Sequence, residues 1–157
     1  MISVQTDDFE VEAEYTSLRN QAGDAGAIVM FTGLVREMCA AQGGDPENLG
    51  KTKLLFLEHY PGMTENQLNI IAREAATRWP LLGVRIIHRV GELYPGDQIV
   101  LVATASSHRR EAFESADFIM DFLKSRAPFW KKQTSESDSR WIKSHKSDVD
   151  ALKRWCE

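Results

Sequence analysis

Positive charge brackets an apolar stretch of the chain, residues 106–133. The stretch begins with a His-Arg-Arg cluster at positions 108–110 and ends, after a proline, with a lysine pair at positions 131–132. Cations at the start of a helix oppose the helix dipole, and a bound anion offsets the cost of placing them there. The cluster therefore indicates a phosphate or carboxylate site, with a solvated surface turn as an equally common alternative.

Further cations could join this site. Lys124 falls in the last turn of the expected helix, where a cation suits the dipole and means little by itself. Lys131 and Lys132 lie on an expected strand, and alternation sends them to opposite faces, so one of them can turn inward beside Lys124. A lysine crowded by cations can serve as a general base or nucleophile. Arg36, which ends a hydrophobic strand, could form a third wall of an anion pocket, although arginines at strand ends are usually only solvated.

Charge is unevenly distributed along the 157 residues, whose net charge is −4. Residues 1–107 carry 8 Lys/Arg and 14 Asp/Glu, whereas residues 108–146 carry 9 and 6. A basic region on an acidic protein favours a focused anion site over general polyanion binding. Cys39 and Cys156 lie far apart, and no His/Asp/Glu spacing is typical of a metal site. We expect no metal and no cofactor.

The length predicts one domain over residues 1–157. No run reaches the roughly 20 apolar residues of a membrane span, and the N-terminal residues lack a signal core, so we expect a cytoplasmic protein. The hydrophobic pattern predicts strands over residues 2–5, 27–37, 53–60, 84–93, 98–105, 129–135 and 140–144. It predicts helices over residues 9–20, 64–79 and 108–126, with a short helix or docked arm at the C-terminus. This order indicates an α+β fold with a mixed or mostly antiparallel sheet.

Several local features follow from the pattern. The strand at 27–37 is expected to be mostly buried, and Gly33 within it indicates either a bulge or a place where a ligand comes close to the backbone. A capping box at positions 64–67 and a serine cap at positions 106–107 should start the two later helices. Residues 38–51 form a long polar loop that could cover the site. His59 and His88 are expected to be hydrogen-bonded structural residues. The apolar face of the last helix is expected to comprise Ala112, Phe113, Ala116, Ile119, Met120 and Leu123, widened by Phe118 and Phe122.

Four segments, in this order, resemble the catalytic (large) subunits of molybdopterin synthase: FTGLVRE, LEHYPGMTE, HRVGELYPGDQIVLVATASSHR and FIMDFLKSRAPFWKK. The resemblance covers about residues 1–155. It implies an α/β hammerhead fold and a sulfurtransferase of molybdenum cofactor biosynthesis, which converts cyclic pyranopterin monophosphate (precursor Z) into molybdopterin. It also implies a small ubiquitin-like partner whose Gly-Gly C-terminus carries the sulfur as a thiocarboxylate. Two large subunits would form a central dimer, with one small subunit at each end of a heterotetramer.

The resemblance also implies roles for individual residues. Lys124 and Lys131 would be the catalytic pair, stabilising charge at the acyl carbon and moving protons. Phe31 and Met120 match positions near the partner's tail. The phosphate-bearing substrate would meet the start of the 106–133 stretch and the tail its end, as two walls of one pocket. The substrate-binding positions fall on Leu34, Val35, Arg36, His108, Arg109, Lys132 and Gln133.

This chain departs from its relatives at three places. Gln133 stands where many relatives carry Glu, His145 stands where some carry Arg, and the loop at 38–51 is longer than in shorter relatives. The sequence leaves open what these departures do, which lysine meets the acyl carbon, and the order of the two sulfur transfers. The alternative functions are a non-catalytic anion- or nucleic-acid-binding module that uses residues 108–132, and a scaffold that binds the partner without turnover.

Overall fold

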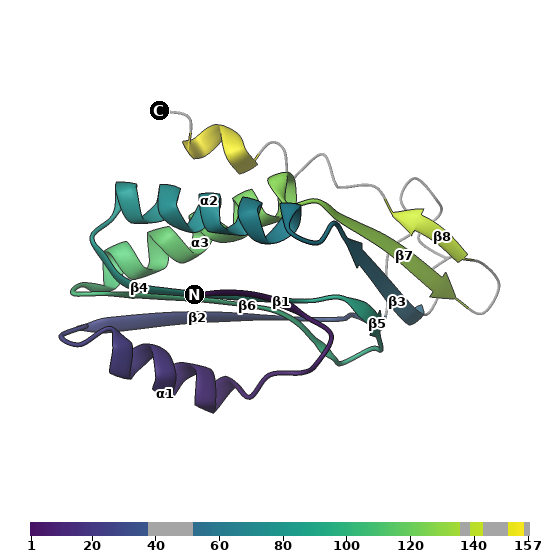
Figure 1. Ribbon diagram of the computed structural model, residues 1–157, viewed down its shortest axis with the longest axis horizontal. Coiled ribbons are helices and arrows are strands. Elements are labelled where there is room, and N and C mark those ends of the chain that lie inside the picture. Colours follow the sequence, from purple (N-terminus) through teal and green to yellow (C-terminus); the bar gives the residue numbers. More distant parts are fainter. Residues whose placement is uncertain (38–51, 136–138, 143–150, 156–157) are drawn as a thin grey trace.

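The computed structural model describes residues 1–37, 52–135, 139–142 and 151–155 (Figure 1). The order of elements predicted from the sequence is confirmed, except that the strand expected at 84–93 is two strands. The elements are β1 (Ile2–Gln5), α1 (Val11–Gln21), β2 (Ala27–Leu34), β3 (Thr52–His59), α2 (Met63–Arg78), β4 (Leu81–Arg89), β5 (Gly91–Leu93), β6 (Gln98–Ser106), α3 (Arg109–Arg126), β7 (Phe129–Ser135), β8 (Ser139–Ile142) and η1 (Leu152–Trp155).

The strands form two four-stranded sheets, in the orders β1-β4-β6-β2 and β5-β3-β7-β8. β1 runs parallel to β4, and all other neighbours are antiparallel, which gives the expected α+β class. The division of the strands into two sheets was not expected, and its cause lies at Gly91. Its φ of +84° is a left-handed conformation that glycine adopts without steric cost, so the chain turns there from the first sheet into the second.

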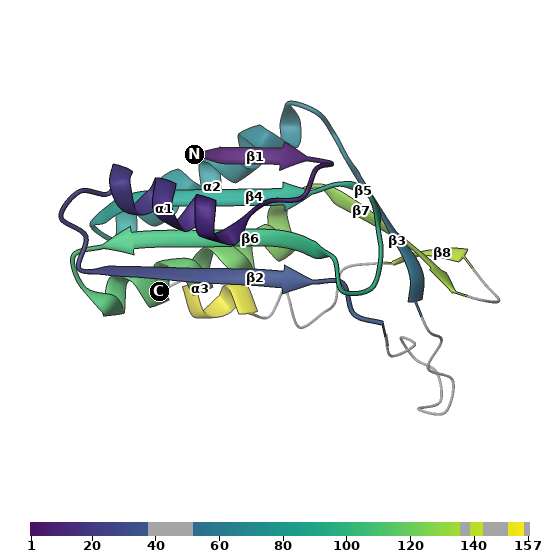
Figure 2. The ribbon, with the colours of Figure 1, turned by 90° about the horizontal axis from the view of Figure 1, so that it is seen from below.

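The helices cover both faces of the first sheet, with α2 and α3 on one side and α1 on the other (Figures 1 and 2). The main core lies under α2 and α3 and includes Phe118, which is fully buried. The expected apolar face of α3 is wrong at Phe113, which is 63% exposed. Phe118 packs edge-on against Trp79, the residue that follows α2, with ring centroids 5.3 Å apart. This contact turns the buried face toward α2 and leaves Phe113 in solvent.

β2 lies at the edge of the first sheet and is only half-buried, so the expectation of a mostly buried strand is wrong. Phe31 and Leu34 are 41% and 57% exposed, because the sheet covers this strand on one side only. The bulge at Gly33 is confirmed by a shift in the β2–β6 register immediately after it. A Cβ on Gly33 would lie 2.7 Å from Val100 Cγ1, so glycine is needed for close packing here.

Both expected helix caps are wrong. At the start of α2, the Gly62 N–H donates to Glu65 Oε2 (2.6 Å), while the Thr64 hydroxyl oxygen accepts from the Tyr60 N–H (3.1 Å). At the start of α3 the capping position is His108, which makes no side-chain cap. Ser106 belongs to β6, and its hydroxyl donates to the Pro80 carbonyl (3.1 Å).

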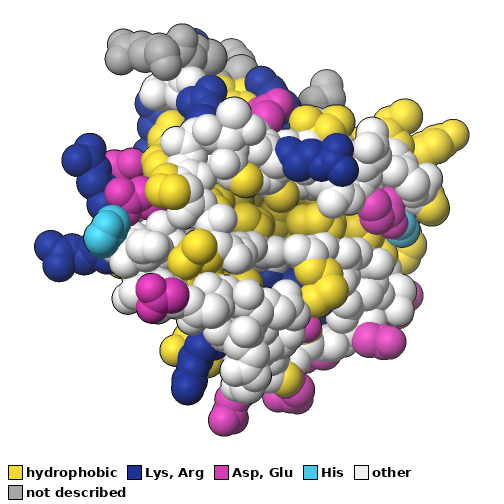
Figure 3. Space-filling view, turned by 60° about the vertical axis from the view of Figure 1, so that its left-hand side comes forward, with side chains coloured by type: hydrophobic (Ala, Val, Ile, Leu, Met, Phe, Trp, Pro, Cys, Tyr) yellow, Lys and Arg dark blue, Asp and Glu magenta, His cyan; other side chains and the backbone are white. Residues whose placement is uncertain are grey.

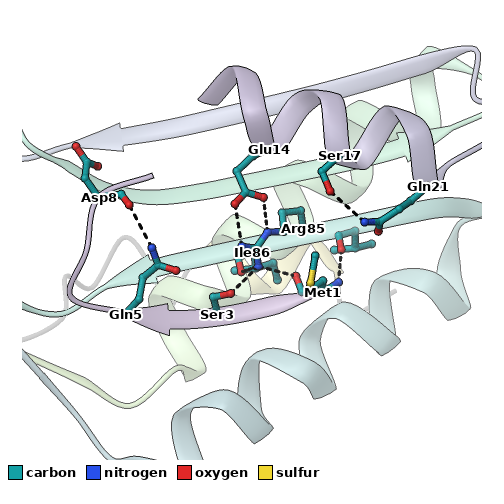
Figure 4. A network of polar contacts seen from close by, with 10 residues as sticks. Met1, Ser3, Gln5, Asp8, Glu14, Ser17, Gln21, Arg85 and Ile86 are labelled. Atoms are coloured by element: carbon teal, nitrogen blue, oxygen red, sulfur yellow. Dashed lines mark hydrogen bonds and ion pairs between the residues drawn. The ribbon is translucent and has the colours of Figure 1, made fainter. Parts of the chain in front are cut away.

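A partly buried ion pair, which the sequence pattern did not reveal, joins α1 to the first sheet (Figure 4). Arg85 of β4 is 7% exposed and donates from Nε to Glu14 Oε2 (2.6 Å) and from Nη1 to Ser3 Oγ (2.7 Å). The hydrogen bond from Arg85 lowers the pKa of Glu14. Because removing the Glu14 carboxylate would leave the buried Arg85 charge without its ion-pair partner, this contact fixes α1 and β1 against β4.

The C-terminal segment is a docked arm, as expected. The Trp155 ring packs edge-on against Trp79 and Phe118, with centroids 5.8 and 5.4 Å apart. Its Nε1 donates to Asp121 Oδ2 (2.8 Å), which also accepts from Arg154 Nε (2.9 Å). In the part of the chain that the structure describes, no helix is both long enough and apolar enough to span a membrane.

Candidate functional site

One end of the molecule gathers cations from three elements. β2 runs antiparallel to β6, and α3 follows β6 and packs back along β6 and β2, so α3 and β2 run in the same direction (Figure 2). The segment after β2, which holds Arg36, therefore lies at the same end as Lys124 in the last turn of α3. The chain turns there at Pro128 and continues as β7, which carries Lys131.

The segment Leu34–Arg36 is held by its central residue. The Val35 side chain is 6% exposed and packs in a core cluster with Leu57, Val90 and Leu93. Leu34 and Arg36, on either side of it, are exposed. The inward packing of Val35 thus presents its two neighbours to solvent, and the Val35 side chain itself supports the segment from below.

Lys131 and Lys132 occupy opposite faces of β7, as alternation predicted. Lys131 pairs in register with Leu57, the fully buried residue of β3, and so shares its face. Lys132 pairs with Phe56 and Trp141 on the other face, with Nζ 5.9 Å from the Trp141 ring centroid. Lys131 is therefore the lysine that faces the body of the molecule, while its side chain and that of Lys124 remain exposed.

His88 supports the strand that carries Lys131. Its ring stacks on Phe129, the first residue of β7, with centroids 3.8 Å apart and an interplanar angle of 18°. Nδ1 lies 2.8 Å from the Arg89 carbonyl oxygen and donates to it. Burial lowers the pKa of His88 to about 4; the Arg89 hydrogen bond opposes this, and the charges of Lys131 and His59 add to it. His88 is thus a neutral, hydrogen-bonded structural residue, as expected from the sequence.

The lowered pKa of His88 predicts a pH-dependent stability. Because an unfolded histidine has a pKa near 6.5, the unfolded state binds more protons below that pH, and stability falls as the pH drops from 6.5 toward 4. His88→Phe keeps an aromatic ring against Phe129 but cannot titrate. Between pH 7.5 and pH 5, we expect the wild type to lose about 2 kcal/mol more unfolding free energy than the variant in urea titrations. An equal loss in both proteins would contradict this assignment.

The His108–Arg109 pair lies at the opposite end of α3, where both side chains are exposed. Gly26 holds this end against the start of β2, since a Cβ on it would collide with the Ser107 carbonyl oxygen. The neighbouring Arg110 forms an ion pair with Glu114 (2.7 Å). A view from this side shows cations and a histidine projecting from the surface (Figure 3).

The two groups of cations are far apart within one chain. His108 and Lys124 are separated by the whole of α3, and a rise of 1.5 Å per residue puts them about 24 Å apart. One small substrate cannot contact both. The expectation that both ends of the 106–133 stretch line one pocket of a single chain is therefore wrong.

The other predicted positions lie around the Lys124 end or beyond the described residues. Phe31 is an exposed residue on the face of β2 toward α3, and Met120 is half-buried at the edge of the core on α3. Gln133 pairs with Leu55 and Arg140 in the second sheet. Cys39, the loop at 38–51 and His145 lie outside the described residues.

No metal centre is found among the residues that the structure describes, since they hold no group of three or more His, Cys, Asp and Glu side chains suited to one. A shallow hollow lies on α1, on the far face of the first sheet from α3, lined by Glu10, Glu12, Ala13, Thr16, Ser17 and Asn20. Its acidic lining does not suit an anion. The cation-bearing end near Lys124 is therefore the candidate site.

Known proteins resemble the chain over almost its full length. The family model described as MoaE protein matches residues 4–126. The molybdopterin synthase catalytic subunit of Vibrio cholerae is 52% identical over 155 residues, covering 98% of this chain and 97% of the relative. The MoaE protein of Burkholderia ambifaria superposes with a TM-score of 0.81 at 47% identity, covering 99% and 97% of the two chains.

A more distant structure shows the fold in an assembly. It is the complex of subunits 1 and 2 of the molybdopterin-converting factor from Helicobacter pylori, with a TM-score of 0.71 at 16% identity, covering 92% of this chain and 91% of that one. At that identity the likeness supports the fold alone. On the strength of the family match and the near full-length relatives, this chain belongs to the MoaE family, that of the molybdopterin synthase catalytic subunits of molybdenum cofactor biosynthesis.

Proposed function

We propose that the whole chain, residues 1–157, forms one catalytic domain that converts cyclic pyranopterin monophosphate into molybdopterin. The sulfur comes from the C-terminal thiocarboxylate of a small ubiquitin-like subunit that ends in Gly-Gly, and the reaction takes place in the cytoplasm. Family membership makes the chain an enzyme of molybdenum cofactor biosynthesis. Its relatives are named catalytic subunits of molybdopterin synthase, and a catalytic subunit implies a further subunit, which supports the partner.

This proposal is supported by the topology, which puts the segments that carry Arg36, Lys124 and Lys131 at the same end of the fold. Both reactants are anionic, because the substrate bears a phosphate and the partner's tail bears a thiocarboxylate. Arg36 suits the phosphate, since its guanidinium offers a planar fork of donors. Lys124 and Lys131 stabilise the charge that develops at the acyl carbon and move protons during sulfur attack.

The remaining predicted positions complete the site. Leu34, Lys132 and Gln133 lie on the segments that carry Arg36 and Lys131, and are assigned to the substrate. Of these, Lys132 would reach it from the face of β7 opposite to Lys131. Phe31 and Met120 line the path of the partner's tail, because an exposed aromatic ring and a half-buried thioether give an apolar surface beside Lys124.

A second copy of the chain supplies His108 and Arg109. These residues lie about 24 Å from Lys124 in their own chain, so they can meet the same substrate only across an interface. A two-fold dimer makes this contact twice, because each copy presents both ends of α3 to the other. The homodimer is then the core of a heterotetramer, with one small subunit bound to each copy.

Nucleic-acid binding by the basic segment fits the structure less well. Several of its cations are neutralised within the chain, as Arg110 pairs with Glu114 (2.7 Å) and Arg126 with Glu74 (3.4 Å). The basic residues of the segment are divided between the start of α3 and the region of its last turn and β7, rather than forming a continuous basic strip. Such a strip would be needed to follow a phosphate backbone.

The test is reconstitution with the small subunit in two forms. With a thiocarboxylated tail, we expect conversion of cyclic pyranopterin monophosphate to molybdopterin, with two thiocarboxylates consumed for each product molecule. The same subunit with an ordinary carboxylate tail should bind and yield no product. Binding of the thiocarboxylated subunit without conversion would overturn the enzymatic assignment in favour of a scaffold. A salt-sensitive affinity for generic RNA together with no conversion would favour the nucleic-acid alternative.

A further inference from the structure

The turn at residues 94–97 connects the two sheets. β5 ends at Leu93, which pairs with Leu55 of β3, and β6 begins at Gln98 in the first sheet. β3 also pairs with β7, the strand that carries Lys131. The turn therefore begins in the sheet of the proposed catalytic lysine and ends in the sheet whose edge strand is β2.

The same turn holds the segment that follows β2. The Val35 N–H donates to the Asp97 carbonyl oxygen (2.9 Å), and the Gly96 N–H donates to the Val35 carbonyl oxygen (2.9 Å). Both backbone groups of Val35 are thus bonded to the turn, and its side chain is buried. The turn therefore fixes the backbone position from which Arg36, the next residue, extends.

Asp97 closes this turn with its side chain. Its Oδ2 accepts from the Tyr94 N–H (2.8 Å), while its own N–H donates to the Tyr94 carbonyl oxygen (2.9 Å). Gly96 supplies the left-handed backbone that the turn requires, with φ of +92°. The hydrogen bond to this carboxylate is therefore one of the two hydrogen bonds that join the ends of the turn.

We propose that Asp97 is a positioning residue that sets where Arg36 stands relative to Lys131, without itself touching the substrate. This inference rests on the proposed function, in which Arg36 holds the substrate's phosphate. A misplacement of about 1 Å in a binding group can lower a rate about 100-fold, so a turn that joins both halves of the site is a sensitive point. The spacing between Arg36 and Lys131 then depends on the Asp97–Tyr94 contact.

The test is a double-mutant cycle on the complex with the thiocarboxylated small subunit. We expect Asp97→Ala to raise the KM for cyclic pyranopterin monophosphate about tenfold and to change kcat less than about threefold. Asp97→Asn should restore KM to within about threefold of the wild type, because its amide oxygen can accept from the Tyr94 N–H. In an Arg36→Ala background, Asp97→Ala should raise KM no further, since the group it positions is gone.

Two other outcomes would contradict either the inference or the proposed role of Arg36. An equal rise in KM from Asp97→Ala in both backgrounds would overturn the inference and leave the role of Arg36 intact. A normal KM in Arg36→Ala would overturn that role, and with it the basis of the inference. Should Asp97→Ala fail to fold, Gly96→Ala takes its place with the same expectation. It strains the turn through the φ of +92°, and the added Cβ meets no atom within 4 Å.

Discussion

Replacing Lys124 or Lys131 with alanine is expected to lower kcat for molybdopterin formation by about 10²- to 10⁴-fold, with a smaller change in KM. Each substitution removes a charge that the proposed mechanism uses when the acyl carbon is attacked, rather than when the substrate binds. The measurement is single-turnover conversion with saturating thiocarboxylated small subunit. Full turnover in both variants would show that the catalytic pair is misassigned.

A matched control lies two residues from Lys124. The Arg126 guanidinium pairs with Glu74 and stacks over the Phe122 ring at 4.2 Å, so its role is structural, at the surface of α3. Arg126→Ala should keep kcat within about threefold, because a partly exposed ion pair contributes little. A loss as large as that of Lys124→Ala would show that helix stability, not chemistry, causes the effect.

Arginine variants separate the two roles of the lysines. Arginine keeps the positive charge but does not release a proton at neutral pH. A lysine that acts by charge alone should therefore retain most of its activity as arginine. A lysine that transfers protons should lose as much activity with arginine as with alanine. Comparing Lys124→Arg with Lys131→Arg thus assigns the proton transfer to one of the two positions.

Local patterns predicted most elements well, because they report local physics. Pro128 cannot continue a helix, and α3 ends at Arg126 as the sequence suggested. β7 spans the residues expected from their β-propensity, and Lys131 and Lys132 alternate as a strand requires. The bulge at Gly33 was equally visible, since a glycine inside an apolar strand marks close packing.

The features that were missed depend on contacts between distant parts of the chain. Whether Gly91 would break a strand or lie within it depends on the second sheet that receives Leu93. The turn near Asp97 gains its role from Val35, some sixty residues earlier, and no local pattern links the two. Closeness in sequence was also a poor guide to closeness in space. His108 and Lys124 belong to one short stretch, yet a helix carries them far apart.

The separation of the two cation groups makes a strong prediction about mixed dimers. Consider one copy with His108→Ala and Arg109→Ala, and another with Lys124→Ala and Lys131→Ala. Each variant alone should be nearly inactive as a homodimer. In a mixed dimer, the intact lysines of the first copy face the intact His108–Arg109 end of the second, which rebuilds one complete site. The other site of the same dimer carries all four substitutions.

We therefore expect a mixed dimer, isolated through two different affinity tags, to show about half of the wild-type kcat per dimer, because two-fold symmetry gives one intact site in two. A homodimer of either variant that carries both tags is the control and should stay inactive. If each chain held a complete site of its own, every chain in the mixture would lack one group, and activity could not return. Recovery would thus place the two ends of α3 in one site across the interface, whereas no recovery would remove the second copy from the mechanism.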